Sequence, residues 1–235
     1  MKRDLSTRTD REVANARSSD GEIDAFLARA KVATKGPGVG RLIFALDATM
    51  SRQPTWDSAM ANQSRMFETV GKVGALDVQL VYFRGFGECR ASRWVSDPSS
   101  LRSLMERIDC RGGQTQLRKV LAHAAKEARR GRVAALVYIG DAMEENIDSV
   151  CTAAGELGLR GIPCFMFHEG RDQTAERAFR EIARLSKGAY VRFGSGSASK
   201  LADLLSAVAA YAAGGLPALE KRGGESDRKL LEQLR

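Results

Sequence analysis

The chain has few of the residues that most often build metal-thiolate or disulfide sites. Its 235 residues include four cysteines and two histidines. The two histidines, His123 and His168, have no cysteine or histidine partner at ligand spacing, so we expect neither to be a zinc ligand or a catalyst. The cysteines also stand singly: Cys89, Cys110, Cys151 and Cys164. Free thiols in a reducing cytoplasm fit this pattern.

Long apolar runs are also absent. No run approaches the roughly 18 apolar residues of a membrane-spanning helix, so we expect no membrane partner. Residues 1–20 alternate charged and small polar residues and lack the apolar stretch of a signal peptide. The sequence has no glycine-lysine nucleotide-binding motif, so any ATPase that works with it would be a separate protein. A cytoplasmic location is the resulting expectation.

Positive charge exceeds negative charge, with a formal net charge of +8 and a pI near 9.6. The densest positive stretch, 118–132, contains a single acidic residue, Glu127, beside six cations: Arg118, Lys119, Lys126, Arg129, Arg130 and Arg132. We interpret it mainly as a solvated helix face whose cations suit the helix C-terminus. An acidic partner is the open alternative. We do not expect nucleic acid, because no recognised motif or interleaved aromatic residue accompanies the charge.

Alternating strand and helix patterns predict an α/β fold with a doubly wound, mostly parallel sheet flanked by helices. Several strands are almost continuously apolar, which is typical of parallel sheets covered on both faces. The segment 76–95 has two strand-like runs around Gly85 and Gly87, so we expect a hairpin and one antiparallel edge strand. The predicted strands are 41–47, 76–84, 91–95, 133–140, 162–168 and 189–193.

Composition divides the chain into three parts. Residues 1–37 form a charged N-terminal segment with a short amphipathic helix at 23–32, and 38–213 form the α/β domain. A closing helix is expected at 201–213, ended by two glycines. Residues 214–235 are expected to be a charged, solvated tail.

Three short polar segments follow or neighbour these predicted strands. Asp47, Thr49 and Ser51 follow the first strand, Asp141 follows the strand that ends near 140, and Thr115 follows Gly112-Gly113 before a helix. Side chains at i, i+2 and i+4 of an extended segment share one side, so the first three converge. Strand carboxyl ends are where open α/β sheets bind ligands.

All five groups offer oxygen, and carboxylates mixed with neutral hydroxyls suit a hard cation such as Mg²⁺, with Mn²⁺ as an alternative. If the two carboxylates lie about 5 Å apart, they repel by roughly 3 kcal/mol at an effective dielectric of about 20. A bound divalent cation would remove that repulsion.

These residues resemble the metal-ion-dependent adhesion site (MIDAS) of von Willebrand factor type A (VWA) domains, which have a Rossmann-like fold. The resemblance covers about 38–213 and implies that Asp47, Thr49, Ser51, Thr115 and Asp141 hold Mg²⁺ directly or through water. The sixth position would take an acidic residue of a partner protein, so the implied activity is metal-dependent protein binding without catalysis. It also implies an accessory subunit of a cytosolic multiprotein complex or ATPase-linked machine.

Four neighbouring residues depart from the pattern of that family. Met50 and Arg52 stand where small residues are common, which would narrow the groove or place a cation beside it. Glu144 and Glu145 follow Asp141 where a glycine is frequent, and they are accessory candidates for the metal.

Several alternatives remain open at the level of sequence. Each motif residue, taken alone, is more often a helix cap. Asp47 would cap a helix that begins near Thr55. Thr115 and Asp141 would each cap the helix that follows it. A Mg-dependent phosphatase of haloacid dehalogenase type shares the order of these residues, but Thr49 replaces the second carboxylate that would act as general acid. A nucleic-acid accessory protein would use the basic helix, and its binding would fall steeply with salt.

Overall fold

The computed structural model describes residues 40–52, 76–194 and 198–234. The expected N-terminal segment 1–37 and the helix expected near Thr55 lie outside this range. The described residues form one compact unit. The strands are β1 (Gly40–Asp47), β2 (Leu76–Arg84), β3 (Glu88–Val95), β4 (Ala135–Gly140), β5 (Cys164–Glu169) and β6 (Ala189–Phe193). The helices are the 3₁₀ turn η2 (Met50–Arg52), α3 (Pro98–Met105), α4 (Leu117–Ala128), α5 (Ile147–Leu159), α6 (Gln173–Ser186), α7 (Ala198–Arg222) and α8 (Glu225–Leu234).

The six strands form one sheet in the order β3-β2-β1-β4-β5-β6. All neighbours run parallel except β2 and β3, which pair antiparallel at the edge. The predicted doubly wound fold, the hairpin and the antiparallel edge strand are therefore confirmed. Of the strand boundaries, the largest difference is in β3, which begins at Glu88 rather than at residue 91.

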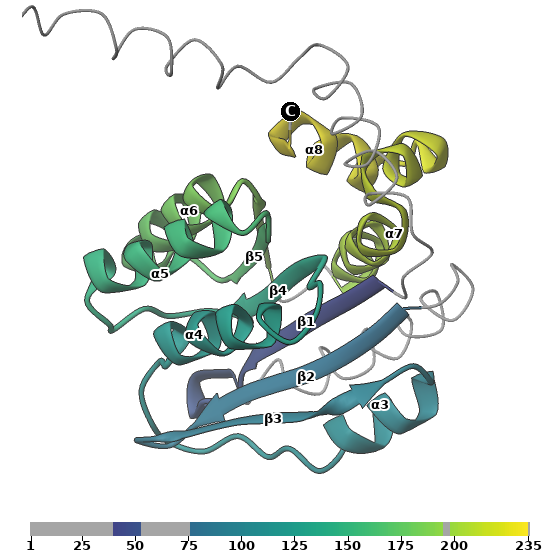
Figure 1. Cartoon of the computed structure of the whole chain (residues 1–235). Coiled ribbons are helices and arrows are strands. Elements are labelled where there is room, and N and C mark those ends of the chain that lie inside the picture. Colours follow the sequence, from purple (N-terminus) through teal and green to yellow (C-terminus); the bar gives the residue numbers. More distant parts are fainter. Residues whose placement is uncertain (1–39, 53–75, 195–197, 235) are drawn as a thin grey trace, which may run out of the picture. The chain divides into compact units, whose positions relative to one another are not determined.

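Helices cover both faces of the sheet (Figure 1). One core cluster joins β-strand side chains such as Phe44 and Val137 to α3, α7 and α8. The other joins side chains of the opposite face, such as Ile43 and Leu136, to α4, α5 and α6. Every residue of β4 is buried, so this strand exposes neither face to water. Such a strand has no outward side, which explains its continuous apolar sequence.

The chain reverses its direction of winding between β1 and β4. After β1 it continues to β2 on one side, and it later returns to β4 on the other side of β1. A crevice forms outside the carboxyl ends of the strands at such a switch point, and open α/β sheets bind ligands there. The predicted site residues Asp47 and Asp141 lie at this point.

The C-terminal segment differs from the expected solvated tail. Helix α7 continues to Arg222 across a kink at Gly215, whose φ of 68° is in the left-handed region that favours glycine. Helix α8 follows, and its Leu230 and Leu231 are buried in the same core cluster as β1. The Gln233 side chain also accepts a hydrogen bond from the backbone N–H of Tyr190 in β6, at 2.8 Å. The expectation of a solvated tail was wrong, because two leucines among charged residues are sufficient to dock α8 against the core.

One stretch in the described part of the chain, Leu201–Arg222, is long and apolar enough to cross a membrane by length and composition. Of the 18-residue apolar stretch within this segment, 56% is buried inside the protein. Buried core helices pass the same test, and Leu204 and Val208 of this helix lie in the sheet core. The finding therefore carries no membrane assignment.

The docking of α8 predicts a stability difference between two leucines. We expect Leu230→Ala, at a fully buried side chain, to lower the free energy of unfolding by about 3 kcal/mol. The matched change Leu159→Ala, at a side chain 92% exposed, should cost less than about 0.5 kcal/mol. Urea denaturation of both variants measures the difference, and equal stabilities would contradict the docking of α8.

Candidate metal centre

Two neighbouring parallel strands deliver the two aspartates to the same edge of the sheet. In the register of β1 and β4, Leu46 lies beside Ile139. Asp47 is one residue beyond Leu46, and Asp141 is two beyond Ile139, so the two lie at adjacent strand ends. The negative charge of Asp141 raises the pKa of Asp47, as expected for two close carboxylates.

Asp47 is fully buried, and its two carboxylate oxygens have different surroundings. Oδ1 accepts the backbone N–H of Thr49 at 2.8 Å, whereas the buried Oδ2 has no hydrogen-bond partner among the described residues. Burial raises the pKa of Asp47 to about 6, and the Asp141 carboxylate adds to the rise. Hydrogen bonds from Thr49 and the charge of Arg52 oppose it. Oδ1 of Asp141 is likewise buried without a partner in this part of the chain.

The turn after β1 brings the two predicted hydroxyls together. Thr49 Oγ1 and Ser51 Oγ lie 3.1 Å apart, in hydrogen-bonding distance. Thr49 is buried and Ser51 is exposed, so the pair leads from the interior toward solvent. The two hydroxyls therefore lie close together as predicted, but for a different reason: Ser51 lies in the 3₁₀ turn η2 and not in an extended segment, so the strand alternation does not extend to it.

Thr115 reaches the same edge because its loop is bonded to the segments that follow β1 and β2. The backbone N–H of Arg111 donates to the carbonyl of Ala48 at 3.0 Å, and that of Gln114 donates to the carbonyl of Gly85 at 3.3 Å. A Cβ at Gly113 would lie 2.2 Å from the Gly85 carbonyl oxygen, so only glycine permits this approach. The loop thus lies directly against the turn that carries Thr49.

Thr115 is also joined to the loop after β4. Its hydroxyl accepts the backbone N–H of Glu144 at 3.1 Å, and its own N–H donates to the Glu144 carboxylate at 2.7 Å. The Glu145 carboxylate accepts the backbone N–H groups of Leu117 and Arg118 at the start of α4. Both glutamates therefore serve the backbone at the N-terminus of α4, where negative charge is favourable. Their accessory role toward a metal stays a prediction.

The capping alternative does not account for Thr115 or Asp141. The cap position of α4 is Gln116, which makes no side-chain cap bond, and the cap of α5 is Asn146, which accepts from Ser149 N–H at 2.9 Å. The helix that Asp47 was expected to cap lies outside the described residues. Two of the three motif residues are therefore left without a capping function.

Arg52, which the sequence marked only as a departure, is almost completely buried. Its guanidinium pairs with the Glu169 carboxylate at the end of β5, at 2.7 Å, with both side chains at most 9% exposed. Removing either partner would leave an uncompensated buried charge. The pair fixes the turn after β1 to a third strand end, and it places a guanidinium whose charge also acts on Asp47.

His168 is the penultimate residue of β5, next to this edge, and it lies inside the core. Its side chain is fully buried, Nδ1 lies 2.9 Å from the hydroxyl of Tyr190, and the ring packs edge-on against Phe179. The imidazole is thus part of the core beneath α6.

The donor set fits a hard cation with an incomplete protein shell. Across residues 40–52, 76–194 and 198–234, no three His, Cys, Asp or Glu side chains gather as a metal-binding group. The candidate instead combines two carboxylates with three hydroxyls, and each carboxylate keeps a buried oxygen without a partner. Mg²⁺ usually binds through one or two carboxylates and keeps several waters, so this set is sufficient for it.

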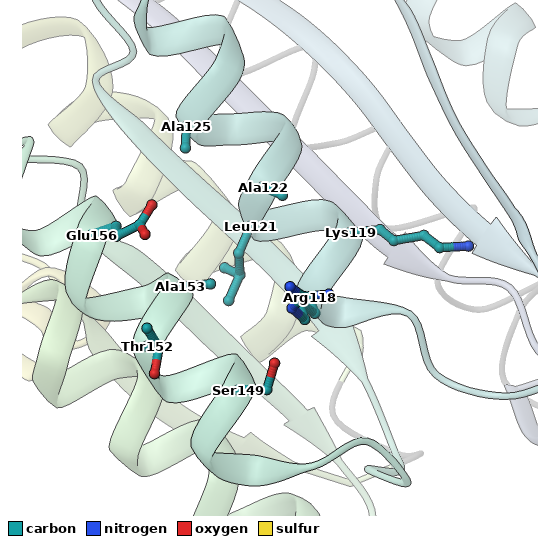
Figure 2. A pocket seen from close by; sticks show the side chains of 9 residues that line it. All are labelled: Arg118, Lys119, Leu121, Ala122, Ala125, Ser149, Thr152, Ala153 and Glu156. Atoms are coloured by element: carbon teal, nitrogen blue, oxygen red, sulfur yellow. The ribbon is translucent and has the colours of Figure 1, made fainter.

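A shallow groove begins beside this edge, between α4 and α5 (Figure 2). Its volume is about 350 Å³. Arg118, at the start of α4, and Ser149, at the start of α5, lie near one end, and Glu156 lies further along α5. The side chain of Lys119 points away from it, toward the carbonyl of Gly87, to which it donates at 3.1 Å.

Comparison with solved structures identifies the fold as that of VWA domains. A von Willebrand factor type A protein from Catenulispora acidiphila matches with a TM-score of 0.60 at 15% identity, over 74% of this chain and 43% of its own. The vWF domain of the type V pili tip protein Mfa5 from Porphyromonas gingivalis matches with a TM-score of 0.59 at 8% identity, over 72% and 94%.

Proximal thread matrix protein 1 from the mussel byssus, solved with a zinc-occupied MIDAS motif, matches with a TM-score of 0.58 at 16% identity, over 72% and 48%. At these identities the likeness shows the fold alone, and this chain spans less than half the length of the Catenulispora and mussel chains. No protein-family model and no curated protein matches the sequence.

The buried Asp47 carboxyl predicts how the metal-free protein responds to pH. The pKa is about 6 in the folded chain, compared with 3.8 for an ordinary aspartate, so the folded chain binds this proton more tightly. The resulting stabilisation is fully present below pH 3.8 and is lost as the pH rises through about 6. Between those limits, wild type should lose about 3 kcal/mol of unfolding free energy relative to Asp47→Asn.

Chemical denaturation in the presence of a chelator, at several pH values, measures this difference. If the two proteins keep a constant stability difference from about pH 4 to about pH 7, Asp47 does not have the raised pKa on which this account depends.

Proposed function

We propose that the chain is a divalent-metal-dependent protein-binding module. Asp47, Thr49, Ser51, Thr115 and Asp141 would hold Mg²⁺, or Mn²⁺, directly or through water. The observation that carries the proposal is a pair of buried carboxylate oxygens, Asp47 Oδ2 and Asp141 Oδ1, at the switch point of a VWA fold, neither of which has a hydrogen-bond partner among the described residues. Buried polar atoms are nearly always satisfied in native proteins, by an ion or a water where no protein group is available, and for two adjacent carboxylates a cation is the complementary partner.

Each residue would contribute differently to such a site. Asp47 and Asp141 supply charge, and their mutual repulsion is relieved when a cation lies between them. Thr49, Ser51 and Thr115 supply neutral oxygens, so the hydroxyl ligands add no negative charge to that of the two aspartates. A bound Mg²⁺ with an open coordination position would then accept a carboxylate of a partner protein. The site residues would position the metal and orient the partner carboxylate, and no bond would be broken.

The surroundings of the site favour a protein as the partner. Met50, in the turn between Thr49 and Ser51, exposes 53% of its side chain to solvent. Flexible, polarisable methionine side chains suit protein-binding surfaces. The groove that begins at Arg118 adds an exposed guanidinium and the hydroxyls of Ser149 and Thr152 beside the candidate site. A partner segment whose carboxylate reaches the metal would extend over these groups.

The biological setting is part of the same proposal. A module without a nucleotide-binding motif fits an accessory subunit of a cytoplasmic multiprotein complex, with any ATPase as a separate chain. A non-catalytic role is supported by the donor set, because Thr49 stands where a phosphatase of haloacid dehalogenase type would need its acid.

Isothermal titration calorimetry with Mg²⁺ and Mn²⁺ tests the metal site. We expect saturable binding to wild type and none to Asp47→Ala or Asp141→Ala, because each change removes half of the carboxylate charge. Thr49→Ala should weaken binding by about tenfold only, since water replaces a neutral ligand. Circular dichroism should show all three variants folded, because the residues lie at the rim of the sheet.

Asp148→Ala is the matched control, because it removes an exposed carboxylate from the first turn of α5. It should bind metal as wild type does. Undiminished affinity in both Asp47→Ala and Asp141→Ala would refute the site.

A further inference from the structure

A second surface lies on the same side of the sheet as α4. Its residue Cys89 in β3 is two strands from Asp47, because Cys89 pairs with Phe83 of β2 and Phe83 pairs with Asp47 of β1. It is a groove of about 340 Å³ between α4 and the β2–β3 hairpin. Its apolar lining comes from Val81, Cys89, Ala91 and Ala122. All four side chains are small or medium in size, so the space above them stays open for side chains of another molecule. We call this surface the basic groove because of the residues that complete it.

Those residues are Arg90, Lys119, His123 and Lys126. None of the described residues that line the groove is acidic. Lys119 donates to two neutral acceptors, the carbonyl of Gly87 at 3.1 Å and the amide oxygen of Gln116 at 2.8 Å, so its charge is held in place but not neutralised.

His123 is fixed by a 2.8 Å hydrogen bond between Nε2 and the amide oxygen of Gln79. Arg90 shares the Glu88 carboxylate at 3.0 Å with the guanidinium of Arg84. The groove thus keeps an excess of positive charge, from Lys119 and Lys126, around an apolar floor.

The position in the fold makes this groove accessible. Strand β3 is an edge strand of the sheet. The groove therefore opens at an edge where no further strand of the described chain pairs. Lys119 and Lys126 are both exposed, so they place a positive field at the mouth of the groove. Such a field speeds the approach of acidic molecules.

We propose that the basic groove binds an acidic segment of a partner protein, which places an apolar side chain on Ala91 and Ala122 and carboxylates against Lys119 and Lys126. The combination of an apolar floor with a cationic rim is complementary to that chemistry. Single-stranded nucleic acid is less well matched, because it needs aromatic side chains for base stacking and the described lining contains none. The inference does not depend on the metal, and its test is run in a chelator.

Fluorescence polarisation with two labelled peptides tests the proposal. One peptide has a central leucine between two pairs of glutamates, and the other has glutamines in place of the glutamates. We expect the glutamate peptide to bind wild type in excess EDTA and the glutamine peptide not to bind. Lys126→Glu should weaken binding by about fivefold, the effect of one well-placed exposed ion pair.

Arg177→Glu on α6 is the matched control, because it changes the net charge equally at an exposed position outside the groove. It should leave the affinity within about twofold of wild type, since exposed charges beyond about 10 Å are screened at 0.1 M salt. A second variant, Ala122→Phe, keeps the charge but fills the groove at an exposed helix position, and it should also weaken binding.

Cysteine alkylation locates the peptide independently of these variants. Cys89 in the groove and Cys151 on α5 are both half-buried, and burial raises the pKa of both thiols. The glutamate peptide should slow the alkylation of Cys89 and leave that of Cys151 unchanged, as followed by mass spectrometry.

Equal loss of affinity in Lys126→Glu and Arg177→Glu, or equal protection of both cysteines, would overturn the proposal. A single-stranded oligonucleotide that binds more tightly than the peptide and protects Cys89 would also overturn it, in favour of a nucleic-acid surface.

Discussion

The central strands β1 and β4 are enclosed by helices on both faces, and this constraint determines where the protein can place polar groups. Every residue of β4 is buried, as are the last six of β1, so their polar side chains have to be at the strand ends. Asp47 and Asp141 occupy the carboxyl ends of these neighbours, at the point where the winding of the chain reverses. The fold therefore gathers charge at one edge, and the surrounding loops have to compensate for it.

Compensation at that edge comes from several segments far apart in sequence. Arg52 and Glu169 form a buried ion pair between the turn after β1 and the end of β5. Glu145 is placed against the positive N-terminus of α4, where its negative charge is favourable. These contacts do not compensate the two carboxylates Asp47 and Asp141, each of which has one buried oxygen without a described partner. A divalent cation is the simplest chemical complement of these two carboxylates.

Sequence reasoning predicted most of the sheet, because buried parallel strands leave long apolar runs and the hairpin glycines are conspicuous. It missed α8, where Leu230 and Leu231 alone among charges gave too weak a periodicity to separate a docked helix from a tail. It recognised the candidate ligands from their order and spacing. It did not foresee the Arg52–Glu169 pair or the capping by Glu145, since these join residues 117 and 27 positions apart and depend on strand register that no local pattern encodes.

The most direct test of this account is a crystal structure of the protein grown with Mn²⁺, with an anomalous difference map recorded at the manganese edge. The account predicts one strong peak among the oxygens of Asp47, Thr49, Ser51, Thr115 and Asp141, bound directly or through water, with a water or a neighbouring carboxylate completing its shell. A saturating Mn²⁺ concentration that gives no peak there, or a peak bound by other residues, would contradict the claim that this edge of the sheet is a metal site.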